Sequence, residues 1–255
     1  MRKKNIISVI IPYYKKKLYF KETINSVISQ KFKNFEVIVI YDDEDKTDLI
    51  FIKSVIKNKK NIKLIINRKN LGAGISRNRG IKIAKGRYIA LIDSDDLWSK
   101  EKLSFQYDFM KKNNIKISHT SYDIINSKNE IIGNRPAKKI QNYKDLISSC
   151  DIGLSSVMLD KKILAKNKFL NLITKEDYSL WLNLSKKHNI YGLKKNLVKW
   201  RKTDNSLSSN TIQKLKDAYF IYYNQEKQGI LRSLVSVFIL SVNFLIKKIT
   251  NKKIK

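Results

Sequence analysis

Short apolar runs alternate with longer amphipathic stretches along the first 112 residues. Four runs have the length and β-branched content of buried strands: residues 6–11, 35–40, 62–66 and 88–92. Apolar side chains at helical spacing follow each run, over residues 18–30, 49–56, 75–84 and 99–112. Strands that alternate with helices in this way predict a parallel sheet with right-handed crossovers.

The alternation changes beyond residue 113. Strands are predicted over residues 115–122, 155–159 and 197–201, and helices over residues 143–147 and 176–187. A turn-rich segment covers residues 126–136. Because no Pro- or Gly-rich linker separates the two halves, we expect one continuous domain.

The last part of the chain has an uncharged stretch from Ser233 to Ile246, followed by lysines at positions 247, 248, 252, 253 and 255. The stretch is shorter than the roughly 20 apolar residues that cross a bilayer, and Ser236 and Asn243 interrupt it. One interpretation is a helix that lies on a membrane surface and is anchored by the lysines. The other is a helix packed on the domain or in a dimer interface.

Composition narrows the class of protein. The chain is 42% hydrophobic, which suffices for a folded core, and its 53 Lys and Arg against 22 Asp and Glu give a net charge of +31. A basic surface can bind nucleic acid by counterion release, but the lysines are spread along the whole chain, which favours a general compositional bias. The charge would still attract an anionic membrane, at about 1 kcal/mol per nearby Lys or Arg. A single cysteine, Cys150, excludes a disulfide framework and fits the cytoplasm.

Three carboxylates, Asp93, Asp95 and Asp96, directly follow the apolar run at residues 88–92. Open α/β sheets bind ligands at the carboxyl ends of their strands, and repulsion among these charges calls for a cation. A hard divalent cation held by one or two carboxylates completes its shell with water and substrate phosphates. The strand end therefore predicts a metal-bound phosphate ester, although Asp96 could instead cap the helix that follows.

The other strand ends supply complementary groups, which a parallel sheet would bring to the same edge. They are Pro12, Tyr13 and Tyr14 after the first run, Asp42 and Asp43 after the second, and Arg68, Asn70, Gly72 and Arg77 after the third. An aromatic ring, a carboxylate for a base, guanidinium groups for phosphate and a metal site are the parts of a nucleoside-diphosphate site. The glycines at 72 and 74 do not form a dinucleotide fingerprint, because the third glycine position is occupied by Arg77.

Five motifs, in this order, resemble those of family 2 glycosyltransferases of GT-A fold: SVIIPYY (8–14), FEVIVIYDD (35–43), NLGAGISRNRGI (70–81), GRYIALIDSDDLW (86–98) and EDYSLWL (176–182). The resemblance covers residues 6–210. It implies an α/β fold of the nucleotide-diphospho-sugar transferase type, with a mostly parallel central sheet flanked by helices and a C-terminal helical extension. It also implies transfer of one sugar from a nucleotide donor, usually a UDP-sugar, to a glycan acceptor with inversion, as in surface-polysaccharide synthesis.

The resemblance also assigns donor-side roles. Asp95 would be the principal ligand of Mn²⁺ or Mg²⁺, with Asp93 against the metal or ribose, and Asp42 or Asp43 would hold the base. The remaining nucleotide-sugar contacts would come from Pro12, Tyr14, Arg77, Ser94 and Arg201. The turn DDEDKTD (42–48) is one residue longer than the family's DDGSTD turn and lacks its glycine, so the choice between Asp42 and Asp43, and uracil as the base, stay open.

On the acceptor side, the resemblance implies that Asp177, in the pair with Glu176, is the general base. A sugar hydroxyl is a poor nucleophile at neutral pH, so a positioned carboxylate must take its proton. Trp181 lies one helical turn later and is a candidate platform for the acceptor sugar, or a core residue.

These expectations define a division of the chain and a setting for the enzyme. Residues 1–210 would form the transferase domain, with a nucleotide-sugar half at 1–112 and an acceptor half at 113–210, and residues 211–255 a helical extension. The partners would be a nucleotide sugar, a glycan or lipid-linked glycan, and an anionic membrane contacted by residues 230–255 at the inner face of the cytoplasmic membrane. A sugar-nucleotide nucleotidyltransferase is the alternative enzyme, but Pro12 and its neighbours replace the glycine-rich phosphate loop it needs. A basic nucleic-acid-binding protein is the third hypothesis, and it leaves the acidic strand end unexplained.

Overall fold

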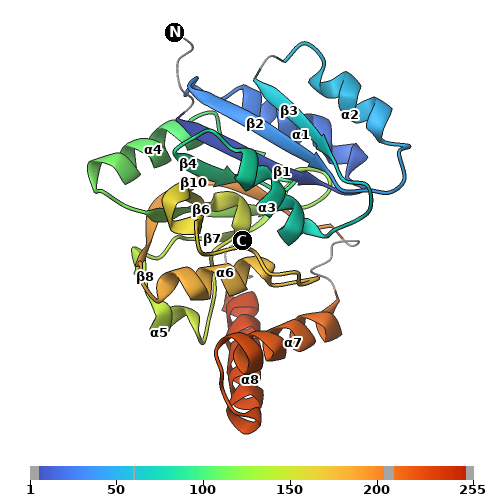
Figure 1. The fold of residues 1–255 in the computed structure, drawn as a ribbon. Coiled ribbons are helices and arrows are strands. Elements are labelled where there is room, and N and C mark those ends of the chain that lie inside the picture. The colour runs from blue at the N-terminus through green and yellow to red at the C-terminus, as the bar shows by residue number, and fades with distance from the viewer. Residues whose placement is uncertain (1–5, 60, 204–209, 251–255) are drawn as a thin grey trace.

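A computed structural model describes residues 6–59, 61–203 and 210–250 (Figure 1). In the first half, strands β1 (Ile7–Tyr13), β2 (Phe35–Tyr41), β3 (Ile62–Ile66) and β4 (Tyr88–Leu91) alternate with helices α1 (Lys17–Ile28), α2 (Leu49–Ile56) and α3 (Ala73–Ile83). The four strands are parallel, in the order β3-β2-β1-β4. The predicted alternation and strand direction in this half are confirmed.

The second half extends the same sheet with strands of both directions. Its elements are β5 (Leu97–Trp98), α4 (Lys102–Lys112), β6 (Ile117–Ile125), β7 (Ile131–Arg135), β8 (Ile140–Gln141), α5 (Tyr143–Leu146), η1 (Leu154–Ser156), β9 (Met158–Asp160), η2 (Lys161–Leu164), α6 (Glu176–Ser185) and β10 (Ile190–Arg201). The sheet continues as β4-β9-β6-β10-β5, in which β9 is antiparallel to both neighbours and β6 is parallel to β10. One sheet therefore runs through both halves.

Alternation along each strand gives the sheet two apolar faces. Every residue of β1 and β2 is buried, which explains why both strands are continuous apolar runs. Ile7, Val9 and Ile11 pack with α1, α2 and α4, whereas Ile10 packs with the cluster formed by α3, α5 and α6. The molecule is thus a sheet between two helical layers.

Several local predictions differ from the structure. The strand expected over residues 155–159 is β9 at Met158–Asp160, because residues 154–156 form the helical turn η1. The helix expected from residue 99 begins at Lys102, and its N-cap is Glu101, because residues 97–98 form a short strand against β10. The turn-rich segment at 126–136 contains β7, which pairs with β6. The late strand begins at Ile190, seven residues earlier than predicted, because its first half pairs with β6 and β8.

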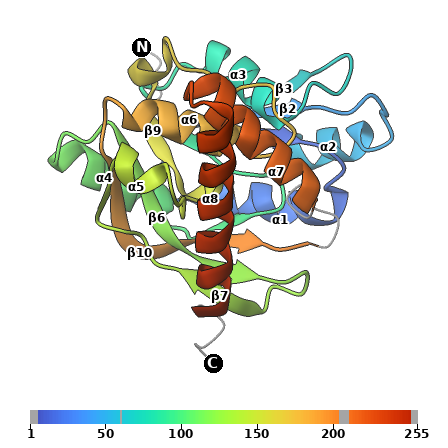
Figure 2. The same ribbon diagram turned by 90° about the horizontal axis from the view of Figure 1, so that it is seen from below.

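The chain ends in α7 (Thr211–Phe220), a π-helical turn (Ile221–Gln225) and the long helix α8 (Ile230–Thr250). Figure 2 shows α8 on the outside of the domain beside α7. Asn243 donates to the carbonyl of Ser148 at 3.0 Å, and Lys247 contacts Asp151 at 2.6 Å, so one side of α8 is attached to the acceptor half. The opposite side is apolar and exposed.

Candidate active site

The carboxyl ends of β1, β2 and β3 meet at one edge of the sheet, as predicted. Tyr13 lies in register with Tyr41, and Tyr41 with Ile66. Directly after β2, the buried Asp42 carboxylate accepts from the Asn67 side chain at 2.6 Å and from the backbone N–H of Leu71 at 2.8 Å. Both bonds use the same oxygen of Asp42, and the described part of the chain shows no donor to its second oxygen.

The other base-side residues differ in how much surface they offer. Asp43 is also buried and accepts from the backbone N–H of Asp45 at 3.2 Å. Pro12 is buried within β1, and Ser94 is buried with its carbonyl accepting from the Thr23 hydroxyl at 3.1 Å. Tyr14 is 37% exposed just beyond β1, so it presents a ring at the edge of the sheet.

Arg77 joins the donor side of the edge to the acceptor side. It lies on α3 with a buried guanidinium, which donates to Asp93 at 2.7 Å and to Glu176 at 2.6 Å and stacks over Phe169. The two carboxylates flank the buried cation, so each compensates the cost of burying it. Arg77 therefore fixes α6, which carries Glu176, relative to the end of β4.

Asp95 and Asp96 are adjacent in sequence but have different surroundings. Asp95 pairs with Lys16 at 2.8 Å, whereas Asp96 is fully buried and accepts from the Ser155 hydroxyl and, at 2.8 Å, from the backbone N–H of Arg201. Burial raises the pKa of both carboxyls, and in Asp95 the nearby Lys16 opposes that rise in pKa. The interpretation of Asp96 as a helix cap is wrong, because it holds β10 against the turn after β4.

Arg201 is fully buried at the end of β10. Its guanidinium donates to the carbonyl of Asp95 at 2.8 Å, pairs with Glu22 at 3.0 Å and lies over the ring of Tyr19. The Arg201 side chain has no exposed surface. The structure therefore does not support the predicted direct contact between Arg201 and a donor phosphate. Arg201 instead holds the turn that carries Asp95.

Trp181 is a core residue. Its side chain is fully buried in α6 and meets Phe169 edge to face at 6.3 Å between ring centroids. An acceptor sugar cannot stack on a ring with no exposed face. The acceptor-platform interpretation of Trp181 is therefore wrong for this structure.

Asp177 has the electrostatics of a general base. The chain enters α6 through Lys175 in the left-handed conformation, φ 59°, and the Asp177 carboxylate accepts from the backbone N–H of Tyr178 at 2.7 Å. Burial, and secondarily the charge of Glu176, raise the pKa of Asp177 to about 7. A carboxylate with a pKa near neutrality can accept a proton and also release it, which is the property that base catalysis needs.

The carboxylates at the end of β4 suit a hard divalent cation. Asp93 and Asp95 interact electrostatically, and a positive group, Lys16, already sits on Asp95. Among the described residues no group of three or more His, Cys, Asp or Glu side chains forms a complete metal cage. Asp93 and Asp95 are the two carboxylates that could hold such a cation, whose other ligands would come from phosphate and water.

The sequence-based prediction missed Lys16 and Ser155. Lys16 belongs to the run at residues 15–17, which resembled the many other lysine runs of a basic chain. The Ser155 hydroxyl accepts from the backbone N–H of Asp93 at 3.0 Å and donates to Asp96, but Ser155 lies in η1, 62 and 59 positions later in the chain. No local pattern distinguishes either residue.

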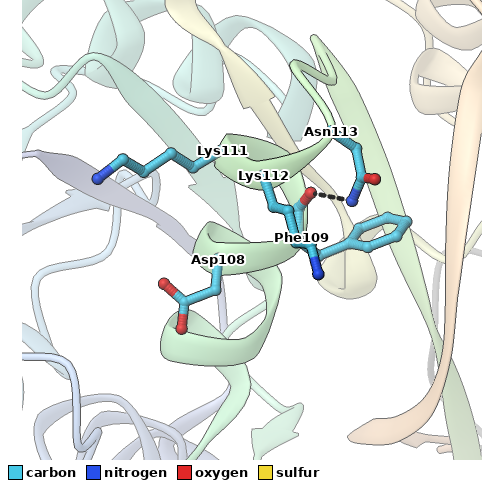
Figure 3. Close-up of a pocket in the computed structure, with 5 residues that line it drawn as sticks. All are labelled: Asp108, Phe109, Lys111, Lys112 and Asn113. Carbon is cyan, nitrogen blue, oxygen red and sulfur yellow. Dashed lines mark hydrogen bonds between the residues drawn. The ribbon is translucent and has the colours of Figure 1, made fainter.

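A hollow at the end of α4 lies elsewhere on the surface (Figure 3). It is lined by Asp108, Phe109, Lys111, Lys112 and Asn113. All five come from one helix end, and the bond among them runs from the Asn113 side chain to the carbonyl of Phe109 at 2.8 Å. Because α4 leads into the start of β6, the hollow is at the opposite edge of the sheet from the carboxylates, and it has no part in the site.

Comparisons with known proteins place this geometry among sugar-transferring enzymes. The family model described as "Glycosyl transferase family 2" matches residues 8–167. The chain is 37% identical over 213 residues to the UDP-Glc:alpha-D-GlcNAc-diphosphoundecaprenol beta-1,3-glucosyltransferase WfgD of Escherichia coli, covering 83% of each protein. It is 30% identical to the putative teichuronic acid biosynthesis glycosyltransferase TuaG of Bacillus subtilis, covering 90% of this chain and 92% of TuaG.

Solved structures share the fold. The S. aureus TarS 1–349 complex with UDP-GlcNAc superimposes with a TM-score of 0.69 at 22% identity, covering 91% of this chain and 71% of TarS. The mannosyltransferase PcManGT from Pyrobaculum calidifontis, in complex with GDP-Man and Mn²⁺, gives a TM-score of 0.68 at 11% identity, covering 93% and 74%. These likenesses confirm the GT-A fold expected from the motifs.

Proposed function

Because this chain belongs to glycosyltransferase family 2, of the bacterial surface-polysaccharide type, we propose that it transfers one sugar from a UDP-sugar to a lipid-linked glycan with inversion. The observation that carries this proposal is the chain of charges from Asp93 through the buried guanidinium of Arg77 to Glu176. It ties the carboxylates suited to a metal diphosphate to the helix that carries a base of pKa about 7. Donor and acceptor chemistry are thereby held at one sheet edge.

The donor side consists of a base pocket and a diphosphate site. We assign the base to Tyr14 and the acidic pair Asp42 and Asp43, of which Asp42 has one oxygen with no donor among the described residues. The names of the relatives WfgD and WfaP specify UDP-Glc, and TarS was solved with UDP-GlcNAc, which supports UDP as the carrier.

Asp95, with Asp93, would hold Mn²⁺ or Mg²⁺, as the PcManGT complex with Mn²⁺ suggests for this fold. The bound cation would neutralise the charge that develops on the leaving diphosphate. Arg201 supports the site indirectly, because its bond to the carbonyl of Asp95 fixes the turn after β4.

The acceptor side depends on Asp177. Its carboxylate would remove the proton from the acceptor hydroxyl as that oxygen attacks the anomeric carbon. A single base opposite the leaving group gives one in-line displacement and inverted stereochemistry. Glu176 contributes by raising the pKa of Asp177, and Arg77 holds the Glu176 carboxylate in place.

We place the acceptor on a lipid and the enzyme at the cytoplasmic face of the membrane. WfgD and WfaP act, by name, on diphosphoundecaprenol-linked GlcNAc. The α8 segment Ile230–Lys247 is long and apolar enough to cross a membrane by length and composition, and only 11% of it is buried. Leu231, Leu234 and Phe238 are 81%, 53% and 69% exposed and share one face of α8.

The opposite face of α8 packs on the domain through Ser233 and Leu240. A helix docked in this way presents its apolar face outward, as an interfacial helix does. We therefore assign residues 1–210 to the transferase domain, with donor and acceptor halves dividing near residue 112, and residues 211–255 to a membrane-contacting extension.

A donor screen tests the proposal. UDP-sugars and GDP-sugars are incubated with and without Mn²⁺ and a polyprenyl-diphosphate-sugar acceptor, and release of the nucleoside diphosphate is measured. We expect metal-dependent release from a UDP-sugar. If no nucleotide sugar is turned over or bound in a metal-dependent manner, the proposed function is wrong.

Two carboxylate variants separate the roles. Asp95→Asn should weaken metal-dependent UDP binding at least tenfold, roughly the loss of one charge-assisted ligand. Asp177→Asn should bind UDP normally and lose transfer. Asp108→Asn, an exposed carboxylate on α4, is the matched control and should behave as the wild type. Equal loss of UDP binding in both site variants would contradict the assignment of the base.

A further inference from the structure

Three consecutive lysines follow β1, and their ammonium groups reach three different places. Lys15, in the left-handed conformation with φ 48°, lies over the ring of Tyr14. Lys17 approaches Asp48 at 3.5 Å with half of its side chain exposed. Lys16, between them, points to the carboxylate of Asp95, the residue assigned to the metal.

The contact of Lys16 is closer and more enclosed than those of its neighbours. Its ammonium nitrogen lies 2.8 Å from Asp95 Oδ2, with the two side chains 22% and 13% exposed. The same nitrogen donates to the Thr203 hydroxyl at 3.2 Å, which joins the end of β1 to the segment after β10. Lys16 is thus held between the turn after β4 and the segment after β10.

Asp95 needs such a partner in the absence of a metal. Its carboxylate is largely enclosed and lies near the carboxylate of Asp93. Arg201 does not supply the counter-charge directly, because it donates to the Asp95 backbone carbonyl. A cation on an enclosed carboxylate that lies beside another negative group compensates part of the cost of burying its charge, and Lys16 is that cation here.

On the basis of the proposed function, we infer that Lys16 is the resident counter-cation of the metal site, displaced from Asp95 when the metal–nucleotide complex binds and then paired with its diphosphate. A bare divalent cation must separate Lys16 from Asp95 and leave it without a negative partner. A cation that arrives with the diphosphate provides the replacement partner, because lysine binds phosphate as a point charge. Lys16 therefore selects the metal–nucleotide complex over the free metal.

Mn²⁺ binding to the full-length protein tests this inference without relying on turnover. Free Mn²⁺ is measured by electron paramagnetic resonance during titration of the wild type, Lys16→Met, Lys16→Arg and Lys17→Met. Without nucleotide, Lys16→Met should bind Mn²⁺ about tenfold more tightly than the wild type, because the competing charge is gone. Lys16→Arg, which keeps the charge, and Lys17→Met, which removes the neighbouring one, should match the wild type.

The second titration uses UDP at saturating Mn²⁺. Lys16→Met should bind UDP about tenfold more weakly than the wild type, since the diphosphate loses its lysine partner. Mn²⁺ affinity that is unchanged or reduced in Lys16→Met overturns the inference, as does the absence of Mn²⁺ binding to every variant with or without UDP. The donor screen tests the proposed function separately, because turnover by the wild type can be detected whichever partner Lys16 takes.

Discussion

Two carboxylates of the candidate site, Asp93 and Asp177, lie in different surroundings. The Asp93 carboxylate pairs with the buried guanidinium of Arg77 at 2.7 Å. Within the described part of the chain no salt bridge involves Asp177, which lies beside Glu176 in a partly buried position. Carboxylates whose environments differ in this way divide the work of charge stabilisation and proton transfer.

The raised pKa of Asp177, about 7, predicts the pH dependence of transfer. The base must be deprotonated, so kcat should rise with pH, level off above about pH 8, and fall about tenfold per unit below about pH 6. The measurement is kcat against pH at saturating donor and acceptor. A flat profile between pH 5 and 8 would exclude Asp177 as the base.

The same pKa predicts a cost in stability. A carboxyl with a raised pKa retains in the folded state a proton that the unfolded chain releases, so stability decreases as pH rises from about 4 to about 7. Asp177→Asn should therefore be more stable than the wild type at pH 8, by roughly 1–2 kcal/mol after solvent screening, or several degrees in Tm. Thermal melts at pH 8 and pH 4 should show this gain at pH 8 and its loss at pH 4.

At the scale of elements, two glycines at the start of α3, Gly72 and Gly74, determine where this helix lies. Gly72 has a φ of 82°, a conformation that favours glycine, and a Cβ on Gly74 would lie 2.6 Å from the carbonyl oxygen of Leu170. This close approach brings Arg77, one turn further along α3, within reach of Glu176. The glycines therefore position the ionic link as well as the turn.

Gly74→Ala should push α3 away from the backbone of Leu170. We expect a loss of about 1–3 kcal/mol in the free energy of unfolding and a marked loss of transfer, because the Arg77–Glu176 contact lengthens. Gly133→Ala is the control, since a Cβ there meets Ile124 at an ordinary 3.6 Å. Urea denaturation and transferase assays of both variants check the prediction, and equal behaviour of the two would contradict it.

The helix α8 has the opposite arrangement from an ordinary surface helix, with apolar side chains outward. Leu234→Gln combined with Phe238→Gln should reduce binding to lipid vesicles by more than tenfold, since each buried side chain is worth about 1.5–3 kcal/mol. Stability should stay nearly constant because both residues are exposed in the protein alone. Leu18→Gln, which removes an 84% exposed leucine from α1, is the control in a vesicle co-sedimentation assay. If the double variant bound vesicles as well as the wild type, the exposed face of α8 would not be the membrane-binding surface.

At the scale of the whole molecule, the net charge of +31 adds a long-range attraction to anionic surfaces. Such attraction is screened by salt, whereas burial of the apolar face of α8 is not. The two contributions can therefore be separated by ionic strength.

Binding to vesicles with anionic lipid should fall more than tenfold between 0.1 and 0.5 M NaCl, and the residual binding should require Leu234 and Phe238. Vesicles of neutral lipid should show only the residual binding. Co-sedimentation over a salt series makes the measurement. Equal binding to neutral and anionic vesicles at low salt would show that the overall charge has no role.

The sequence by itself determined the elements whose environment is uniform. β3 and α2 match their predicted ranges, and β1 and β2 are recognisable because they are buried on both faces. Parallel strands place their carboxyl ends at one edge, so the grouping of Asp42 with Asp93 followed from strand order alone. The resemblance to family 2 added the prediction that Asp177 is the general base.

Only the tertiary structure decided which side chains are free to act. The residues next to Arg201 and Trp181 in the sequence do not show whether these two side chains are exposed or buried. Packing of β10 and α6 against distant segments buries both of them. What distinguishes Lys16 from Lys15 and Lys17 is its partner, Asp95, which lies 79 positions away. Burial and ion pairing depend on contacts between segments that the chain brings together on folding, and local sequence does not record them.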